Sequence, residues 1–146
     1  MSRNFVIENC PQELEPQVKE VFLRSWFPLC RDLGLDPNAV PHGEWTMDAT
    51  RVAMEGPHIL GFTTLRGYEL ERIYLTPGAQ GTGLGAALIN DAVEHGVTYL
   101  WVDEGNSRAR RFYEKNDWRA TDEITFGRHF PNSPVRKYRH YGVPLF

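Results

Sequence analysis

The sequence predicts a single α/β or α+β domain over residues 1–146, and three observations support this class. The chain is long enough for one hydrophobic core and too short for two ordinary domains. Hydrophobic residues at 41% and charged residues at 24% are typical of a globular protein. Helix-like and strand-like patterns also alternate along the chain, without repeats, low-complexity segments or linkers.

The first third of the chain predicts a strand, a helix and a long loop. Residues 5–7 form a short apolar run that we interpret as a strand. From Leu14 the apolar residues recur at helical spacing, which predicts an amphipathic helix ending near Pro28. Prolines and glycines then interrupt residues 28–47, so we expect a loop with one short helical turn there. Loops of this length often line binding sites, and Trp45 is a candidate wall of such a pocket.

The rest of the chain predicts mainly strands, with two helices among them. Three strand-like runs between residues 51 and 76 are separated by very short connections, which favour antiparallel pairing. A helix, a buried strand, a helix capped by Ser107 and a late strand are then expected at 84–95, 98–104, 107–116 and 135–142. Residues 125–134 read as another loop. Helical periodicity favours a core position for Trp26.

The charge balance argues against nucleic acid or an anionic membrane as the main partner, because the net charge is −3. Residues 1–71 carry 11 acids and 6 bases, whereas residues 72–146 carry 8 acids and 10 bases, giving −5 and +2. A cationic ligand is therefore favoured near the first half and an anionic one near the second.

Cysteine and histidine usage predicts neither a disulfide framework nor a metal site. The two cysteines, Cys10 and Cys30, lack metal-ligand spacing, and so do the five histidines. No stretch has the length of a membrane span or the pattern of a signal peptide. We therefore expect a cytoplasmic protein.

A cluster of glycines, Gly81, Gly83 and Gly85, precedes the helix expected at 84–95 and has three interpretations. It is a flexible connection, a dinucleotide-binding fingerprint or a pyrophosphate cradle. The fingerprint fits poorly, because it turns directly from the end of its strand, whereas residues 77–80 intervene here. A Walker A loop is excluded, because no Gly-Lys-Ser/Thr ending follows. Glycines before a helix leave backbone N–H groups open to a diphosphate.

Two motifs resemble one known family. Gln80-Gly81-Thr82-Gly83-Leu84-Gly85 resembles the Q/R-x-x-G-x-G/A motif of the GNAT superfamily of acetyl-CoA-dependent N-acetyltransferases, and residues 106–113 resemble its N-x-x-A-x-x-F-Y block. The block usually continues to a glycine, where this chain has Asn116-Asp117. Asn or Asp also adopts the left-handed conformation expected there.

The resemblance implies a mixed, mostly antiparallel central sheet of six to seven strands flanked by about four helices. It also implies a transferase that uses acetyl-CoA as co-substrate and no metal. The residues that would bind the cofactor are Ile73, Leu75, Gln80, Gly81, Thr82, Gly83, Leu84, Gly85, Ala86 and Asn106. For Ile73 and Leu75 the backbone, at a point where the sheet splays, would make the contact; Asn106 has the alternative of capping a helix.

The catalytic candidates are Glu71, Glu69 and Tyr113. The two glutamates alternate along one strand with Ile73, so we expect all three on one face, where a carboxylate would deprotonate the amine directly or through water. Solvated surface charges are the alternative. Tyr113 matches the family tyrosine that faces the departing sulfur, either as an acid or as a hydrogen-bond donor to the thiolate; a core aromatic is the alternative.

The sequence therefore predicts an N-acetyltransferase that acts on a primary amine, and the favoured acceptor is a small molecule. The alternatives are a protein or peptide N-acetyltransferase and a non-catalytic acyl-CoA-binding module; a dinucleotide-binding oxidoreductase fits least. The acceptor and a homodimeric state remain open.

Overall fold

The computed structural model describes residues 4–38, 47–126 and 132–141. Over these residues one seven-stranded sheet has the order β1-β2-β3-β4-β5-β7-β6. Its strands are β1 (Val6–Asn9), β2 (Thr50–Glu55), β3 (His58–Arg66), β4 (Glu69–Leu75), β5 (Tyr99–Asp103), β6 (Trp118–Phe126) and β7 (Pro134–His140). The helices are α1 (Glu15–Asp32), α2 (Leu84–Glu94) and α3 (Ser107–Lys115), with 3₁₀ turns at Gln12–Leu14, Met47–Ala49 and Pro77–Ala79.

The predicted fold class is confirmed, with three α-helices in the described part of the chain where about four were expected. Among the strands of the described ranges, only the β4–β5 pair is parallel, and the other pairs are antiparallel. The expected turn and pocket wall at residues 39–46, including Trp45, and the centre of the expected loop at 127–131 lie outside the described residues.

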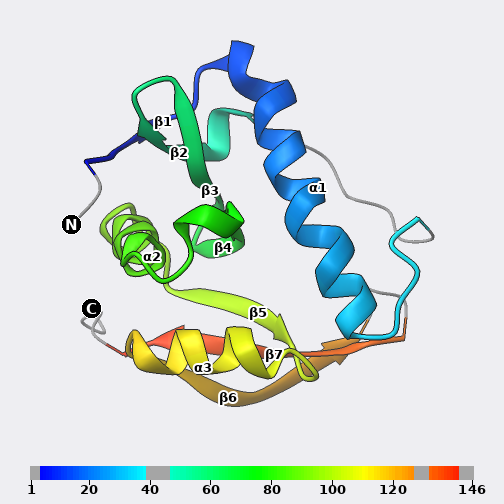
Figure 1. Cartoon of the computed structure of the whole chain (residues 1–146). Coiled ribbons are helices and arrows are strands. Elements are labelled where there is room, and N and C mark those ends of the chain that lie inside the picture. Colours follow the sequence, from blue (N-terminus) through cyan, green and yellow to red (C-terminus); the bar gives the residue numbers. More distant parts are fainter. Residues whose placement is uncertain (1–3, 39–46, 127–131, 142–146) are drawn as a thin grey trace.

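The helices cover the two faces of the sheet (Figure 1). Tyr74 of β4 packs in the cluster formed by α1, whereas Leu75, one residue further along the strand, packs against α2; on β3, Phe62 packs against α1 and the neighbouring Gly61 faces Leu88 of α2. Residues one apart on a strand point to opposite faces, so α1 and α2 lie on opposite sides of β3 and β4. Helix α3 joins the side of α2.

Helix α1 runs through Pro28 to Asp32, so the predicted end near Pro28 is wrong. Proline removes the backbone N–H that would bind the carbonyl of Arg24. Both residues lie on the exposed side of the helix, where water can bind that carbonyl. The buried side continues through Trp26 and Cys30, whose packing keeps the helix intact. The predicted core position of Trp26 is confirmed.

A β-bulge interrupts β4. Thr64 pairs with Arg72 but Leu65 pairs with Leu70, so Glu71 is an extra residue. Leu70 and Ile73 consequently pack in the same cluster beneath α2 and α3, although they are three residues apart. The expected common face of Glu69 and Ile73 is therefore wrong, because the bulge reverses the alternation between them.

Strands β4 and β5 pair only at their beginnings. The parallel register joins Glu69 to Tyr99 and Leu70 to Leu100, and no later pair follows among the described residues. Residues 73–75 of β4 and 101–103 of β5 therefore bound a fork in the sheet, which we call the β4–β5 fork. The β4 edge of the fork has backbone groups outside the sheet ladder, as expected for the splay.

Helix α2 is fixed to the sheet by a largely buried ion pair. Arg51 of β2 donates through Nε and Nη2 to the two oxygens of Asp91, at 2.6 and 2.9 Å. Both side chains are about seven-eighths buried, with exposures of 13% and 12%. A bidentate pair of this kind sets the orientation of two elements as well as their distance.

Two further predictions concern cysteines and membrane spans. Cys10 and Cys30 are free and buried, so no disulfide joins them. In the described ranges no helix is long and apolar enough to cross a membrane.

Thr63 on β3 offers a test of the packing. Its side chain is fully buried, and its hydroxyl has no hydrogen-bond partner within the described residues. We expect Thr63→Val to raise the free energy of unfolding in urea by about 1 kcal/mol, because it removes an unsatisfied polar group. The control is Thr76→Val, which removes a hydrogen bond to the Leu60 carbonyl (3.2 Å) and should lower it by about 1 kcal/mol. A lower free energy of unfolding for Thr63→Val would show that the hydroxyl does have a stabilising partner, and would contradict this description.

Candidate active site

The glycine cluster forms the entrance to α2. After the 3₁₀ turn at Pro77–Ala79, Gly81 and Gly83 take left-handed conformations with φ of 77° and 87°. Gly83 is the N-cap of α2 and has no side chain to bind the first-turn N–H groups. The first turn of a helix has unpaired donors and the positive end of the helix dipole, so this entrance suits an anion.

Gly85 has a different role from Gly81 and Gly83. A Cβ at Gly85 would lie 2.9 Å from Cε1 of Phe112, whereas no atom of the described residues lies within 4 Å of a Cβ at Gly81 or Gly83. Gly85 therefore lets α3 pack closely on α2. Gly81 and Gly83 leave the space outside the helix entrance open, so a molecule outside the chain can approach the backbone.

Arg108 lies beside this entrance. Its Nη2 donates to Oε1 of Gln80 at 2.8 Å, which joins the first turn of α3 to the loop before α2. Thr82 closes the loop by donating from Oγ1 to the Ala79 carbonyl. Arg108 is not among the site residues predicted from the sequence. Only the topology points to this residue. Strands β4 and β5 are parallel, so the helices that follow them, α2 and α3, begin at the same edge of the sheet.

Asn106 is the N-cap of α3. Its Oδ1 accepts a hydrogen bond from the Ala109 N–H at 3.1 Å, so Ser107, which was expected to cap the helix, is the first helical residue. The capping alternative for Asn106 is thus confirmed, and a contact with a cofactor stays a prediction. At the other end of α3, Asp117 takes the left-handed conformation with φ of 68°, as expected.

The two glutamates of β4 have different surroundings. Glu69 is buried, with 8% exposure, and has polar partners. Glu71, at the bulge, accepts a hydrogen bond from Nε of Arg66 at 2.8 Å and lies 3.7 Å from Nη1 of Arg72. The structure therefore does not present Glu71 as a solvated charge, but as a carboxylate already held by two guanidinium groups.

Ile73 and Leu75 lie on the β4 edge of the β4–β5 fork. Their side chains pack beneath α2, and their backbone groups face the part of the sheet where β5 has separated. The Leu75 carbonyl also accepts a hydrogen bond from Oγ of Ser25 at 3.3 Å, so α1 is fixed to this end of the strand.

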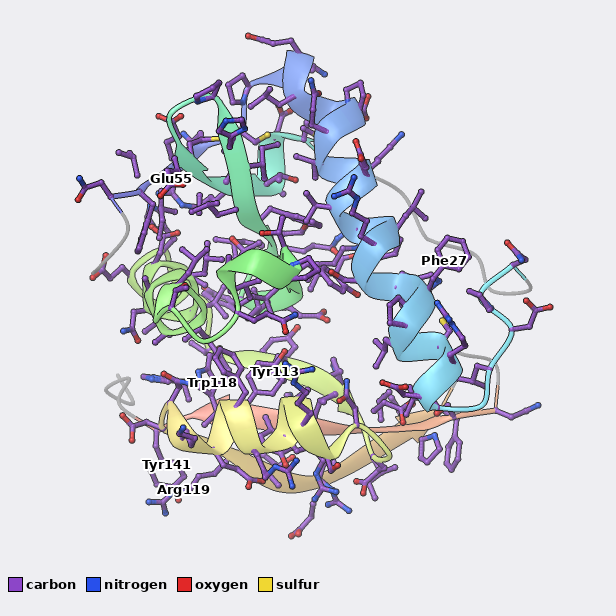
Figure 2. All side chains as sticks on the ribbon, viewed as in Figure 1. Phe27, Glu55, Tyr113, Trp118, Arg119 and Tyr141 are labelled. Carbon is purple, nitrogen blue, oxygen red and sulfur yellow. The ribbon has the colours of Figure 1, made fainter. Side chains whose placement is uncertain are left out.

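Tyr113 lies on the side of α3 that faces β5, with Trp118 beside it (Figure 2). Its ring centroid is 5.4 Å from that of Phe112, 6.4 Å from Trp118 and 6.2 Å from Tyr138. Burial raises the pKa of the Tyr113 phenol, and the nearby Tyr74 raises it further. Tyr113 therefore keeps its proton at neutral pH, so its hydroxyl is able to donate a hydrogen bond.

Tyr138 anchors α3 against β7. Its hydroxyl accepts from Nε of Arg110 at 3.0 Å and donates to Oε2 of Glu114 at 2.8 Å. Arg110 also donates to the Glu104 carbonyl at 3.2 Å, so the helix is tied to the end of β5 as well. These contacts set the position of Tyr113, which lies between Arg110 and Glu114 on the same helix.

The sequence of this chain matches the model of a known protein family. The model of the acetyltransferase (GNAT) family matches residues 13–118, and the chain belongs to that family. The expected resemblance is thus confirmed. An uncharacterized N-acetyltransferase of Mycobacterium tuberculosis strain H37Rv is 34% identical over 108 residues, covering 63% of this chain and 69% of that protein.

Solved structures share the fold at low sequence identity. The apo form of YjaB from Escherichia coli has a TM-score of 0.75 at 17% identity, over 96% of this chain and 99% of that one. The yncA protein of Salmonella typhimurium with its cofactor acetyl-CoA has a TM-score of 0.61 at 15% identity, over 98% and 99%. The ribosomal-protein-S18-alanine N-acetyltransferase of Escherichia coli has a TM-score of 0.60 at 15% identity, over 98% and 99%.

Proposed function

We propose that this chain transfers the acetyl group of acetyl-CoA to the primary amine of a small molecule, by direct attack in a ternary complex. The observation that carries the proposal is the joint placement of the open glycine entrance of α2, the β4–β5 fork and Tyr113. A diphosphate at the entrance, an arm along the fork and a sulfur near Tyr113 together account for the three parts of an acyl-CoA.

The residues at the entrance suit the diphosphate of CoA. The N–H groups of Leu84, Gly85 and Ala86 belong to the first turn of α2, and Gly83 leaves them without a side-chain cap. Gln80 and Thr82 shape the loop in front of them. Along the fork, the backbone of Ile73 and Leu75 would hold the pantetheine arm, and Asn106 would meet it from the start of α3.

The chemistry requires the amine to lose a proton, the carbonyl oxygen to be stabilised and the thiolate to leave. In the reaction the C–N bond forms, the C–S bond breaks, and the proton lost by the amine balances the one gained by the thiolate. We assign the oxyanion to the Ile73 backbone, the thiolate to Tyr113, and the amine proton to a water chain ending at Glu71 or Glu69. Because Glu71 is held by Arg66 and Arg72, water mediation fits it better than direct contact.

A small cationic acceptor fits the charge distribution, because residues 1–71 carry a net charge of −5. The test is release of CoA thiol from acetyl-CoA with a panel of polyamines, aminoglycosides, amino acids and N-terminal peptides. Small amines should give turnover well above hydrolysis. Turnover with peptides alone would favour a protein N-acetyltransferase, and binding of acetyl-CoA without turnover on any acceptor would favour an acyl-CoA-binding module.

Arg108 should strengthen cofactor binding, because its guanidinium lies beside the proposed diphosphate site. We expect Arg108→Ala to weaken acetyl-CoA binding about fivefold at low ionic strength, and less at high ionic strength, in calorimetric titrations. Lys115→Ala is the matched control, because it removes a positive charge from the last turn of the same helix. Equal losses for the two variants would show a general charge effect and contradict a local contact.

A further inference from the structure

Tyr74 of β4 is a second phenol near the proposed reaction centre. It lies beyond the last β4–β5 pair, between Ile73 and Leu75 on the edge of the fork. Its ring packs edge-on against Phe22 of α1, with centroids 5.2 Å apart, and lies 5.6 Å from Phe62 of β3. These contacts fix the ring on the α1 side of the sheet.

Tyr74 and Tyr113 approach each other from opposite faces of the sheet. Tyr74 belongs to the α1 cluster, whereas Tyr113 packs in the cluster of α2 and α3. Both side chains belong to the fork: Tyr74 lies on its β4 edge, and Tyr113 packs in the same cluster as Ile73 of the β4 edge and Val102 of the β5 edge. Because the two strands are not paired there, no backbone ladder separates the two faces of the sheet. In keeping with this placement, the charge of Tyr74 raises the pKa of Tyr113.

Neither phenol has a hydrogen-bond partner within the described residues, although a nearby buried tyrosine does. The hydroxyl of Tyr138 both accepts from Arg110 and donates to Glu114. Both tyrosines are only partly buried, and neither hydroxyl is among the buried polar atoms that lack a partner. Each hydroxyl is therefore open to a molecule bound at the fork, which would supply its hydrogen-bond partner.

Tyr74 also stays protonated at neutral pH, so its hydroxyl can donate a hydrogen bond. Burial raises the pKa of its phenol, and this effect exceeds the opposing one of Arg72. A neutral phenol whose ring is held in a fixed position donates a hydrogen bond with little reorganisation when charge develops on an oxygen. It cannot act as a base at neutral pH.

We propose that Tyr74 is a further catalytic residue, whose hydroxyl donates a hydrogen bond to the acetyl oxygen of acetyl-CoA from the α1 side of the fork. The inference rests on the proposed function. In this arrangement Tyr113 serves the sulfur, Tyr74 serves the oxygen, and the carbonyl carbon between them is left open to the amine.

The test compares acetyl-CoA with CoA, so that it needs no acceptor. We expect Tyr74→Phe to weaken acetyl-CoA binding about three- to tenfold while CoA affinity changes less than twofold, since a hydrogen bond to the acetyl oxygen is lost. Tyr68→Phe is the control, because Tyr68 is exposed at the β3–β4 turn, and it should leave the ratio of the two affinities unchanged. A ratio unchanged by Tyr74→Phe would overturn the inference, whereas a wild-type protein that binds neither molecule would overturn the proposed function instead.

A second readout is the carbonyl stretch of bound ¹³C-labelled acetyl-CoA in infrared difference spectra. A hydrogen bond to this oxygen lowers the frequency, so the band should shift upward in Tyr74→Phe and stay in place in Tyr68→Phe. Should Tyr74→Phe prove unstable, the wild-type band still decides: a frequency equal to that of free acetyl-CoA would contradict a donor at this oxygen. In turnover assays kcat of Tyr74→Phe should fall by only about tenfold, because the backbone N–H group of Ile73 would still stabilise the acetyl oxygen.

Discussion

Tyr113→Phe should lower kcat about 10²-fold and leave the affinity for acetyl-CoA nearly unchanged. The phenol is expected to act only when negative charge develops on the departing sulfur, so its loss affects the transition state rather than the bound substrate. The change keeps the ring, and with it the contacts to Phe112, Trp118 and Tyr138.

The reason for hydrogen bonding, rather than proton transfer, lies in the pKa values. An ordinary phenol has a pKa of about 10 and a thiol of about 8.5, so transfer to the thiolate is already uphill by about 2 kcal/mol. Burial raises the pKa of Tyr113 further, which makes transfer less favourable still. We therefore expect Tyr113 to stabilise the thiolate by donating a hydrogen bond, and the thiolate to take its proton from water or from the acceptor side.

The measurement is thiol release with a saturating acceptor, combined with calorimetric titration of acetyl-CoA. Tyr68→Phe is the control, because Tyr68 is exposed at the β3–β4 turn and should change neither quantity. An unchanged kcat in Tyr113→Phe would remove Tyr113 from the mechanism and leave it as a packing residue of the α3 cluster.

Gly83→Val should weaken acetyl-CoA binding about 10²-fold, because the new side chain would cover the first-turn N–H groups of α2. The space that it would occupy is free in the protein, so the side chain would meet the cofactor rather than the chain itself. The left-handed conformation of Gly83 adds strain, of order 1–3 kcal/mol, which lowers stability as well.

Gly96→Val separates strain from binding. Gly96 also has a left-handed conformation, with φ of 98° and open space around it, but lies at the other end of the same helix. Both variants should lose similar stability in urea unfolding, and Gly83→Val alone should lose acetyl-CoA affinity. Similar affinities in the two variants would place the diphosphate elsewhere.

Much of the fold was predictable because it depends on local patterns. The apolar spacing in α1 and α2, the short turns between β2, β3 and β4, and the glycines before α2 each specify an element within a few residues. The helix end at Pro28 was not predictable in this way, since burial of Trp26 and Cys30 outweighs the lost hydrogen bond. Likewise, period-two alternation could not reveal the extra residue Glu71, because a bulge is defined by the partner strand.

The sequence by itself determined the family motifs, the strand and helix order and the position of the glycine entrance, because neighbouring residues encode these features. Only the tertiary structure decided that Arg108 meets Gln80, that Arg66 and Arg72 hold Glu71, and that Tyr74 and Tyr113 lie on opposite faces of the sheet at the fork. Arg108 and Gln80 are 28 residues apart along the chain. Such pairs form only after the parallel start of β4 and β5 has placed α2 and α3 at one edge of the sheet. The separation of the same two strands then opens the fork between the two phenols.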